Sequence, residues 1–114
     1  MMTFESIKTI RDLVTEAGKA YENRVYLRTL RNNMIHDTTF GQFSLECNAI
    51  AAWTAEQSKN LGHQARVAMI SSNSALYVRM MLGVMVGGGT TVFLDPQATE
   101  DVICACLNKA EADI

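Results

Sequence analysis

A run of three glycines, Gly87-Gly88-Gly89, is the first feature of this sequence that could bind a ligand. Glycine-rich loops bind phosphate when they follow a strand and open a helix, because their backbone N–H groups then point at the anion. Here the order is reversed, since an apolar stretch typical of a helix precedes the glycines and a β-branched stretch typical of a strand follows them. We favour a helix end and a tight turn, and keep phosphate binding as the weaker alternative.

The polar turn Ser71-Ser72-Asn73-Ser74 lies between a predicted strand and a predicted helix. Open α/β sheets bind ligands at this edge, beyond the carboxyl ends of their strands. No lysine or glycine supports a site in this turn, and Asn73 or Ser74 acting as a helix cap accounts for its composition. Capping is the favoured interpretation, with ligand contact as the alternative.

His36 and His63 are isolated from metal-ligating and nucleophilic residues. Neither has a cysteine or carboxylate at metal-ligand spacing or belongs to a serine-nucleophile pattern, so we expect both on the solvated surface. The acidic residues are scattered through helices and caps, and no two of them suggest an acid/base couple. We therefore assign no catalytic, cofactor-binding or metal-binding residue to this sequence.

The three cysteines do not form a recognisable metal or disulfide motif. Cys104 and Cys106 are two apart on a predicted helix, so their side chains point to nearly opposite sides and cannot share a partner. We expect all three to be reduced, small apolar residues, which favours a reducing compartment and a cytoplasmic location.

Composition and charge narrow the class of protein. Hydrophobic residues make up 48% and charged residues 19% of the chain, as in an ordinary globular domain. A net charge of −2 argues against nucleic acid as the main partner. The start, Met1–Glu5, lacks the features of a signal peptide, and the most apolar stretch, Ala75–Val86, is too short to span a bilayer.

The first third of the chain predicts a helix and a hairpin. Thr9 and Asp12 form a plausible capping box for a helix over 10–21. Its apolar stripe consists of Ile10, Leu13, Val14, Ala17 and Tyr21. Strands over 25–30 and 34–38 flank the turn Arg31-Asn32-Asn33, whose asparagines tolerate the left-handed conformation of tight turns.

A second capping box, Thr39 with Gln42, opens a predicted helix that runs to about Leu61 and is capped by Gly62. One apolar face is expected, formed by Phe43, Cys47, Ile50, Thr54 and Leu61. Trp53 is the largest apolar side chain, and truncating it would cost about 3–5 kcal/mol if it were buried.

Residues 67–94 predict a βαβ unit with parallel strands and a right-handed crossover. The strand over 67–70 is continuously apolar, which is typical of a strand covered on both faces. The helix over 75–86 is apolar nearly all round and is expected to be mostly buried, and a strand over 90–94 follows it. Thr99 opens a last helix to about Asn108.

The end of the sequence, Glu111-Ala112-Asp113-Ile114, predicts the start of another parallel strand at Ile114. We therefore expect residues 1–114 to form a single N-terminal subdomain that is incomplete at its C-terminus.

Three stretches together resemble one family. They are Thr39-Phe40-Gly41-Gln42-Phe43, the strand and cap from Arg66 to Ser74, and Gly88-Gly89-Thr90-Thr91-Val92-Phe93-Leu94-Asp95-Pro96. In this order they are similar to the N-terminal part of the AMP-forming adenylating enzymes, which include acyl-CoA synthetases, luciferases and peptide-synthetase adenylation domains. The stretch 9–13 also resembles the opening of a long-chain acyl-CoA synthetase. The sequence departs from the family at 62–65, which lacks an expected aspartate, and at Phe93, where proline is expected.

The resemblance implies an N-terminal subdomain fragment of α/β class, with a β-hairpin and a βαβ parallel sheet flanked by helices. It implies a parent ligase of fatty acid metabolism in which a carboxylate attacks ATP to give an acyl-adenylate and pyrophosphate, and coenzyme A then takes the acyl group. ATP, Mg²⁺ and coenzyme A belong to the full-length parent, because the family's phosphate loop, ribose-binding aspartate and catalytic lysine lie later in the chain. No cofactor is expected on the fragment, which should be inactive.

The implied partner is the rest of the same polypeptide, against which this piece packs. Homodimerisation through the uncovered 75–86 helix or the open sheet edge is also expected of the isolated chain, because large exposed apolar patches usually find partners. Two alternatives remain. One is a self-contained small α/β domain of flavodoxin or receiver type that binds a ligand or a partner. The acidic pair and lysine of receiver domains are not arranged here, which counts against it. The other is a non-catalytic interaction module.

Overall fold

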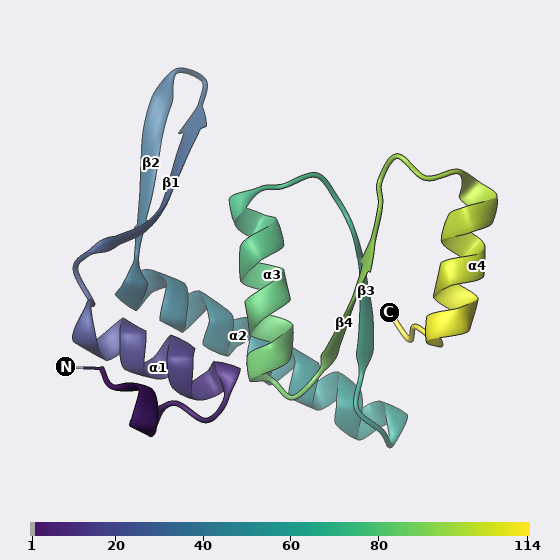
Figure 1. Cartoon of the computed structure of the whole chain (residues 1–114), viewed down its shortest axis with the longest axis horizontal. Helices are drawn as coiled ribbons and strands as arrows, with labels where there is room; N and C mark the ends of the chain where they lie inside the picture. Colours follow the sequence, from purple (N-terminus) through teal and green to yellow (C-terminus); the bar gives the residue numbers. More distant parts are fainter. Residues whose placement is uncertain (1) are drawn as a thin grey trace.

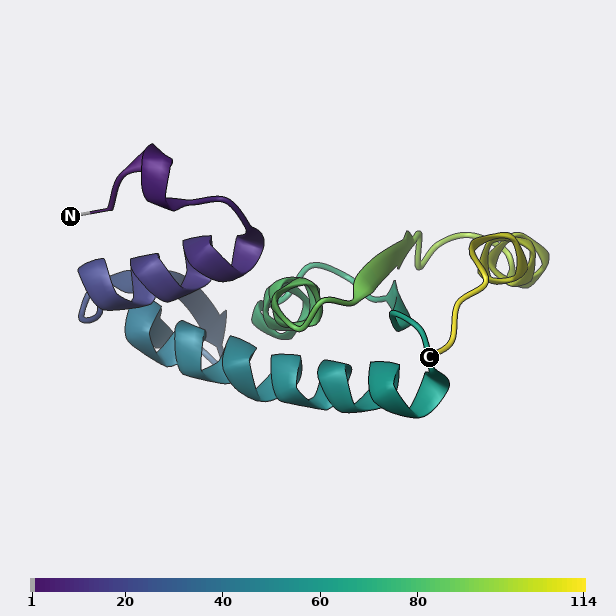
Figure 2. The same ribbon diagram turned by 90° about the horizontal axis from the view of Figure 1, so that it is seen from below.

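The structure is a computed structural model that describes residues 2–114 (Figure 1). Its elements in chain order are η1 (Phe4–Ser6), α1 (Ile10–Ala20), β1 (Val25–Arg31), β2 (Met34–Thr39), α2 (Phe40–Leu61), β3 (Arg66–Ile70), α3 (Ala75–Val86), β4 (Thr90–Leu94) and α4 (Glu100–Ala110). The long helix α2 runs beneath α1 at one end and beneath α3 and the β3–β4 sheet at the other (Figure 2). This arrangement confirms the predicted α/β class and the order of the elements.

Both predicted capping boxes are present. The Thr9 hydroxyl accepts from the Asp12 N–H at 3.1 Å, and the Asp12 carboxylate accepts from the Thr9 N–H at 3.1 Å. The Thr39 hydroxyl accepts from the Gln42 N–H at 3.2 Å, while the Gln42 side chain accepts from the Thr39 N–H at 3.0 Å. Gly62 ends α2 with φ of 76°, a left-handed conformation that suits glycine.

The hairpin is confirmed as an antiparallel pair of β1 and β2. Asn32 and Asn33 form its turn with φ values of 51° and 61°, because asparagine tolerates the left-handed region. The base of the hairpin is anchored by the Tyr26 ring, whose centroid lies 4.8 Å from that of Phe40 and 4.4 Å from that of Phe43. Its tip extends away from the helices (Figure 1).

The core lies where α1 and α3 pack on α2. One buried cluster consists of Val14, Phe43, Cys47, Ala51 and Val86, and a second of Ala65, Val67 and Val84. Gly83 allows close contact between α3 and α2, since a Cβ atom there would lie 2.5 Å from the Ile50 Cβ. The absence of a side chain at this position therefore sets the separation of the two helices.

The βαβ unit is confirmed, with β3 and β4 parallel from the pair Arg66–Thr90 to the pair Ile70–Leu94. The sheet lies between α3 and α4 in both views (Figures 1 and 2). α4 begins after Thr99, as predicted, but the Thr99 side chain makes no capping hydrogen bond and the helix continues to Ala110.

Burial of α3 and β3 differs from the prediction. Only Gly83, Val84 and Val86 of α3 are buried, and Leu76 in its first turn is 63% exposed. In β3 the alternate residues Val67 and Met69 are buried, whereas Ile70 is 48% exposed. The apolar sequences of α3 and β3 predicted burial on nearly all sides. Within residues 2–114, only the C-terminal half of α3 and one face of β3 are buried.

The apolar faces of α1 and α2 are also narrower than predicted. Ile10, Leu13 and Leu61 are each more than a third exposed, and Ala51 takes the buried place on α2 that was assigned to Ile50. Trp53 is 36% exposed, so the condition for a large truncation cost is not met. The buried residues of α2 are Phe43, Cys47, Ala51 and Thr54, so none of the buried positions lies in its last two turns.

The end of the chain lies against β3, on the side away from β4. The Arg66 carbonyl accepts from the N–H groups of Asp113 at 2.8 Å and Ile114 at 3.3 Å, and the Ile114 carbonyl accepts from the Ala68 N–H at 2.7 Å. These slanted bonds follow the pattern of a parallel ladder. They are the contacts that a parallel strand beginning at Ile114 requires.

Candidate functional site

The triple glycine has no free N–H groups to offer a phosphate. Gly87 donates to the Gly83 carbonyl at 3.1 Å, Gly88 to Met85 at 3.1 Å and Gly89 to Val84 at 2.9 Å. The glycines therefore close α3 and satisfy its last carbonyls. The predicted helix end and turn are confirmed, and these N–H groups do not fit the phosphates of ATP.

The Ser71–Ser74 turn lies at the carboxyl edge of the sheet, where α3 leaves on one face and α4 on the other (Figure 2). Ser74 is the cap of α3, its hydroxyl accepting from the Tyr77 N–H at 3.1 Å, and Ser71 donates to the Ser72 carbonyl at 3.0 Å. At the end of β4 the Asp95 carboxylate accepts from the Gln97 N–H at 2.9 Å. These polar groups are thus occupied in local turns, which supports capping over a ligand site.

A hollow of about 560 Å³ opens beside this turn, between the hairpin and the start of α3. Its lining includes Arg79, which donates to the Thr38 hydroxyl at 3.2 Å and forms an ion pair with Glu46. The cation is therefore already paired within the protein. It links α3 to β2 and α2 and is not held ready for an anion.

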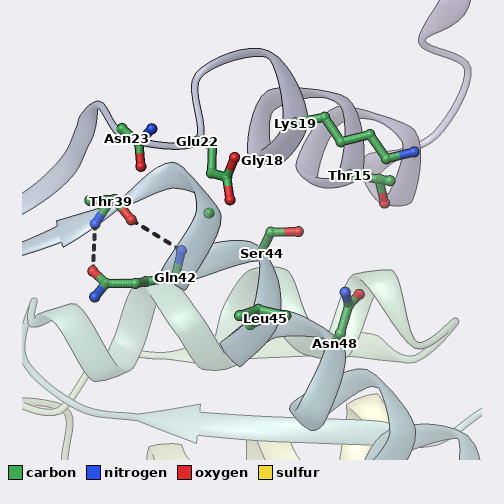
Figure 3. Close-up of a pocket in the computed structure, with 11 residues that line it drawn as sticks. Thr15, Gly18, Lys19, Glu22, Asn23, Thr39, Gln42, Ser44, Leu45 and Asn48 are labelled. Atoms are coloured by element: carbon green, nitrogen blue, oxygen red, sulfur yellow. Dashed lines mark hydrogen bonds between the residues drawn. The ribbon is translucent and has the colours of Figure 1, made fainter.

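A second hollow, of about 500 Å³, is lined mainly by residues with polar side chains and lies between α1 and the start of α2 (Figure 3). The Thr39–Gln42 capping box and the close approach of Gly18 to Ser44 form much of its wall. Lys19 and Glu22 on its rim are exposed. This hollow contains no nucleophile paired with a base, so it provides no arrangement for acid–base or covalent chemistry.

His36 and His63 are both exposed, as predicted, but His63 is not isolated, which corrects that part of the prediction. Its Nε2 lies 3.0 Å from both carboxylate oxygens of Asp113, and Asp113 also accepts from the Arg66 N–H at 2.9 Å. The Arg66 N–H and His63 lower the pKa of the Asp113 carboxyl. Because 50 residues separate this pair, no local sequence pattern indicated it. The cluster fixes residues 111–114 to β3.

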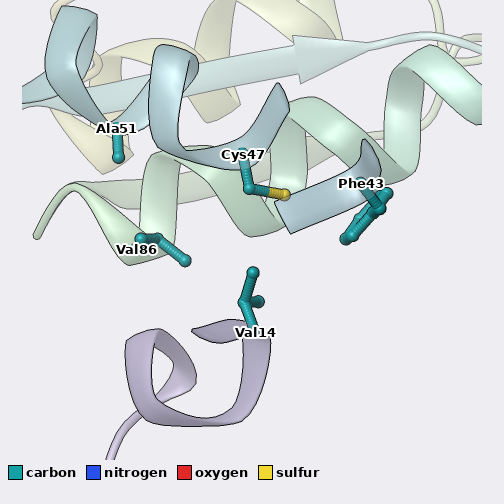
Figure 4. Close-up of a cluster of buried hydrophobic side chains, with 5 residues drawn as sticks. All are labelled: Val14, Phe43, Cys47, Ala51 and Val86. Carbon is teal, nitrogen blue, oxygen red and sulfur yellow. The ribbon is translucent and has the colours of Figure 1, made fainter. Parts of the chain in front are cut away.

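The cysteines lack the environment of a catalytic thiol. Cys47 is fully buried between Phe43 and Ala51, facing Val14 and Val86 (Figure 4), and burial raises its pKa to about 11. A thiol with so high a pKa is a poor nucleophile at neutral pH. Cys104 and Cys106 are exposed and unpaired.

Residues 2–114 contain no group of three or more histidine, cysteine or acidic side chains that could hold a metal ion. No helix among them is both long enough and apolar enough to cross a membrane.

Comparison with known proteins gives the chain a family. The model of the family described as AMP-binding enzyme matches residues 14–114. A search of curated protein sequences found no match.

Solved structures share the fold. The N-terminal subdomain of Klebsiella oxytoca NpsA in complex with 3-hydroxyanthranilyl-AMSN matches with a TM-score of 0.76 at 24% identity, over 93% of this chain and 26% of that one. The fatty acyl-adenylate ligase from L. pneumophila, in complex with acyl adenylate and pyrophosphate, matches with a TM-score of 0.78 at 18% identity, over 98% of this chain and 20% of that one.

The chain thus spans about a quarter to a fifth of the length of these proteins. Its hairpin, parallel strand pair and flanking helices match the N-terminal subdomain of adenylate-forming enzymes. The family model covers nearly the whole chain and agrees with the resemblance seen in its sequence. The protein belongs to the AMP-binding enzyme family.

Proposed function

We propose that this chain is the N-terminal structural portion of an adenylate-forming ligase whose catalytic groups lie elsewhere in the polypeptide. The observation that carries the proposal is the family match over residues 14–114. It is supported by the local hydrogen bonds of the glycine N–H groups of 87–89 and by the role of Ser74 as the cap of α3. The chain's own residues would form outer strands and helices against which the nucleotide-binding part packs.

The parent reaction has two steps. A carboxylate oxygen attacks the α-phosphorus of ATP, and the bond to pyrophosphate breaks to leave an acyl-adenylate. The thiol of coenzyme A then attacks the acyl carbon, and AMP leaves as the thiol proton is lost. ATP, Mg²⁺ and coenzyme A are assigned to the full-length parent, because the described residues provide no site that fits them.

We assign a fatty acid as the substrate of the parent. This follows from the resemblance of residues 9–13 to a long-chain acyl-CoA synthetase, and the Legionella structure bears the name of a fatty acyl-adenylate ligase. An aromatic acid is the second candidate, because the NpsA subdomain is seen with a 3-hydroxyanthranilyl compound. The fold does not separate the two, since the TM-scores are 0.78 and 0.76.

A cytoplasmic location is part of the proposal. It rests on the three unpaired cysteines, which suit a reducing compartment, and on the ATP requirement of the parent reaction.

ATP–pyrophosphate exchange tests this proposal. The purified 114-residue chain and the product of the full-length gene are each assayed with straight-chain fatty acids, with 3-hydroxyanthranilate and without acid. We expect no exchange by the chain, and fatty-acid-dependent exchange by the full-length product followed by thioester formation with coenzyme A.

Each other outcome has a defined meaning. Exchange by the chain alone, above a control without protein, contradicts the assignment of the active site to other residues. Exchange with the aromatic acid only transfers the substrate assignment to the second candidate. A full-length product inactive with every acid would favour a non-catalytic interaction module.

A further inference from the structure

The hairpin of β1 and β2 ends in a cluster of exposed apolar side chains. Leu30 is 73% exposed, Met34 63% and Ile35 64%, and the tip that they form extends away from the helices (Figure 1). Leu30 and Ile35 are directly opposite in the antiparallel register, so their side chains adjoin on one face of the hairpin. We call Leu30, Met34 and Ile35 the apolar tip. Exposed apolar clusters bordered by polar residues mark sites of interaction.

The fold does not require an apolar tip. Among residues 2–114, the tip packs against neither of the two buried clusters. The hairpin is anchored at its other end, where Tyr26 contacts Phe40 and Phe43, and the asparagines at 32 and 33 specify its turn. Threonine would suit these exposed strand positions as well as leucine or isoleucine does. The apolar residues of the tip are therefore better explained by a partner than by folding.

Charge is distributed unevenly between the hairpin and the rest of the chain. The chain has ten basic and twelve acidic residues, of which residues 24–39 contain three arginines and one aspartate. The hairpin thus has a net charge of +2, and the remainder of the chain has a net charge of −4. Asp37 is paired with Arg28 at 2.7 Å. Arg31, beside the tip, is exposed and forms no ion pair among residues 2–114. The positively charged part of the molecule is therefore the part that ends in the apolar tip.

A lipid bilayer with anionic headgroups fits both properties of the hairpin. The tip is the end of a projecting element, and the hollow nearest to it lies along the side of the hairpin, against the start of α3. A projecting apolar end needs a partner that it can enter. The headgroup–acyl boundary of a bilayer accepts apolar side chains to a depth of about 5–10 Å. Arginines beside them are attracted to anionic lipids and reach the phosphates through their long side chains.

We propose that the apolar tip docks this chain on an anionic lipid surface. Leu30 and Ile35 enter the headgroup–acyl boundary, and Arg31 binds lipid phosphate at the surface. The amides of Asn32 and Asn33 stay at headgroup depth, where they form hydrogen bonds. The contact is peripheral. It goes beyond the proposed function, because it needs no nucleotide and does not depend on the acid that the parent activates.

Cosedimentation of the 114-residue chain with vesicles tests the proposal. One set of vesicles consists of equal parts phosphatidylglycerol and phosphatidylcholine, and the other of phosphatidylcholine alone, which has no net charge. The double variant Leu30→Thr/Ile35→Thr removes the apolar pair and keeps residues that suit a strand. The matched control is Leu45→Gln, because Leu45 on α2 is 71% exposed but lies outside the hairpin. Arg31→Gln removes the unpaired charge, and thermal unfolding verifies that every variant is folded.

We expect the chain to bind the anionic vesicles about thirtyfold more tightly than phosphatidylcholine, the factor for two net charges near an anionic surface. The double variant should lower the partition coefficient on anionic vesicles about thirtyfold, the factor for two large side chains that each bury about half of their surface. Leu45→Gln should leave this coefficient unchanged. Arg31→Gln should lower it about fivefold, and only on the anionic vesicles.

No binding to the anionic vesicles, or equal binding to both kinds, would overturn the proposal. So would a double variant that binds like the unaltered chain. A loss with Leu45→Gln as large as that of the double variant would also overturn it, since any exposed apolar residue would then serve. Binding to soluble polyglutamate as tight as binding to vesicles would assign the hairpin to an acidic protein instead. None of these results involves adenylate formation, so they are distinguishable from failure of the proposed function.

Discussion

Gly83→Ala tests how the helices that form the core pack together. The introduced Cβ would lie 2.5 Å from the Ile50 Cβ and 2.6 Å from its Cγ2, closer than real Cβ contacts. Overpacking of this kind costs about 3 kcal/mol at the upper end of its range, and the better helix propensity of alanine returns about 1 kcal/mol. We expect a net loss of about 2 kcal/mol in the free energy of unfolding, or about 8 °C in Tm.

Thermal and urea unfolding followed by circular dichroism measure this loss. The matched control is Ala105→Gly on the exposed face of α4, which reports helix propensity alone and should cost about 1 kcal/mol. In an Ile50→Ala background two of the three closest atoms, Cγ2 and Cδ1, are gone. Gly83→Ala should then cost less, with a coupling energy of at least about 0.5 kcal/mol. If Gly83→Ala stabilises the protein, or costs the same in both backgrounds, the packing argument is wrong.

Three further predictions concern the helix caps, the buried thiol of Cys47 and the contacts of Asp113 with His63 and Arg66. Thr39→Ala should lower the free energy of unfolding by about 1 kcal/mol, because it removes a capping hydrogen bond. Thr99→Ala should have little effect, because the Thr99 side chain makes no such bond. Equal losses of the two variants in urea unfolding would contradict the assignment of Thr39 as a cap and Thr99 as none. Cys47 should resist a thiol reagent at pH 8 in the native protein while the two exposed cysteines of α4 react, because its pKa is about 11; rapid reaction of all three would show that the core opens readily. Asp113→Asn should lower Tm at pH 6, because a carboxyl whose pKa is lowered by folding stabilises the protein at pH values above its ordinary pKa of 3.8. The difference in Tm should shrink as the pH falls below 3.8, since the carboxyl of the native protein is then protonated and loses its contribution. A difference in Tm that stays constant down to pH 2 would refute a role for the charge.

Local signals in the sequence predicted most of the fold. The capping boxes at Thr9 and Thr39 and the paired asparagines at 32 and 33 specify their own conformations through nearby backbone groups, so they need no distant partner. The order of strand, helix, triple glycine and strand predicted the βαβ unit, because strands joined by a helix of this length pair in parallel.

Features that depend on distant residues could not be predicted from the sequence. The apolar pattern of α3 indicates a buried helix, but whether Leu76 is covered depends on elements that do not pack there in residues 2–114. The contact of His63 with Asp113 joins residues far apart in the sequence, and neither has a local motif. The hydrogen bonds of Asp113 and Ile114 to Arg66 and Ala68 likewise join residues far apart in the sequence.

The isolated chain should also self-associate at high concentration, through the uncovered side chains of α3 or the edge of the sheet, because Leu76 of α3 is 63% exposed. Light scattering and binding of an apolar dye measure this directly. A clean monomer that binds no dye would show that the exposed surface is too small to need a partner.

The central claim, that this chain forms the front of an adenylate-forming ligase, is tested most directly by reading the coding sequence beyond the codon for Ile114. We predict several hundred further codons, with a Ser/Thr/Gly-rich loop followed by lysine soon after the start of that stretch. A stop codon directly after Ile114 would contradict the claim and favour a small interaction module that shares the fold of the family.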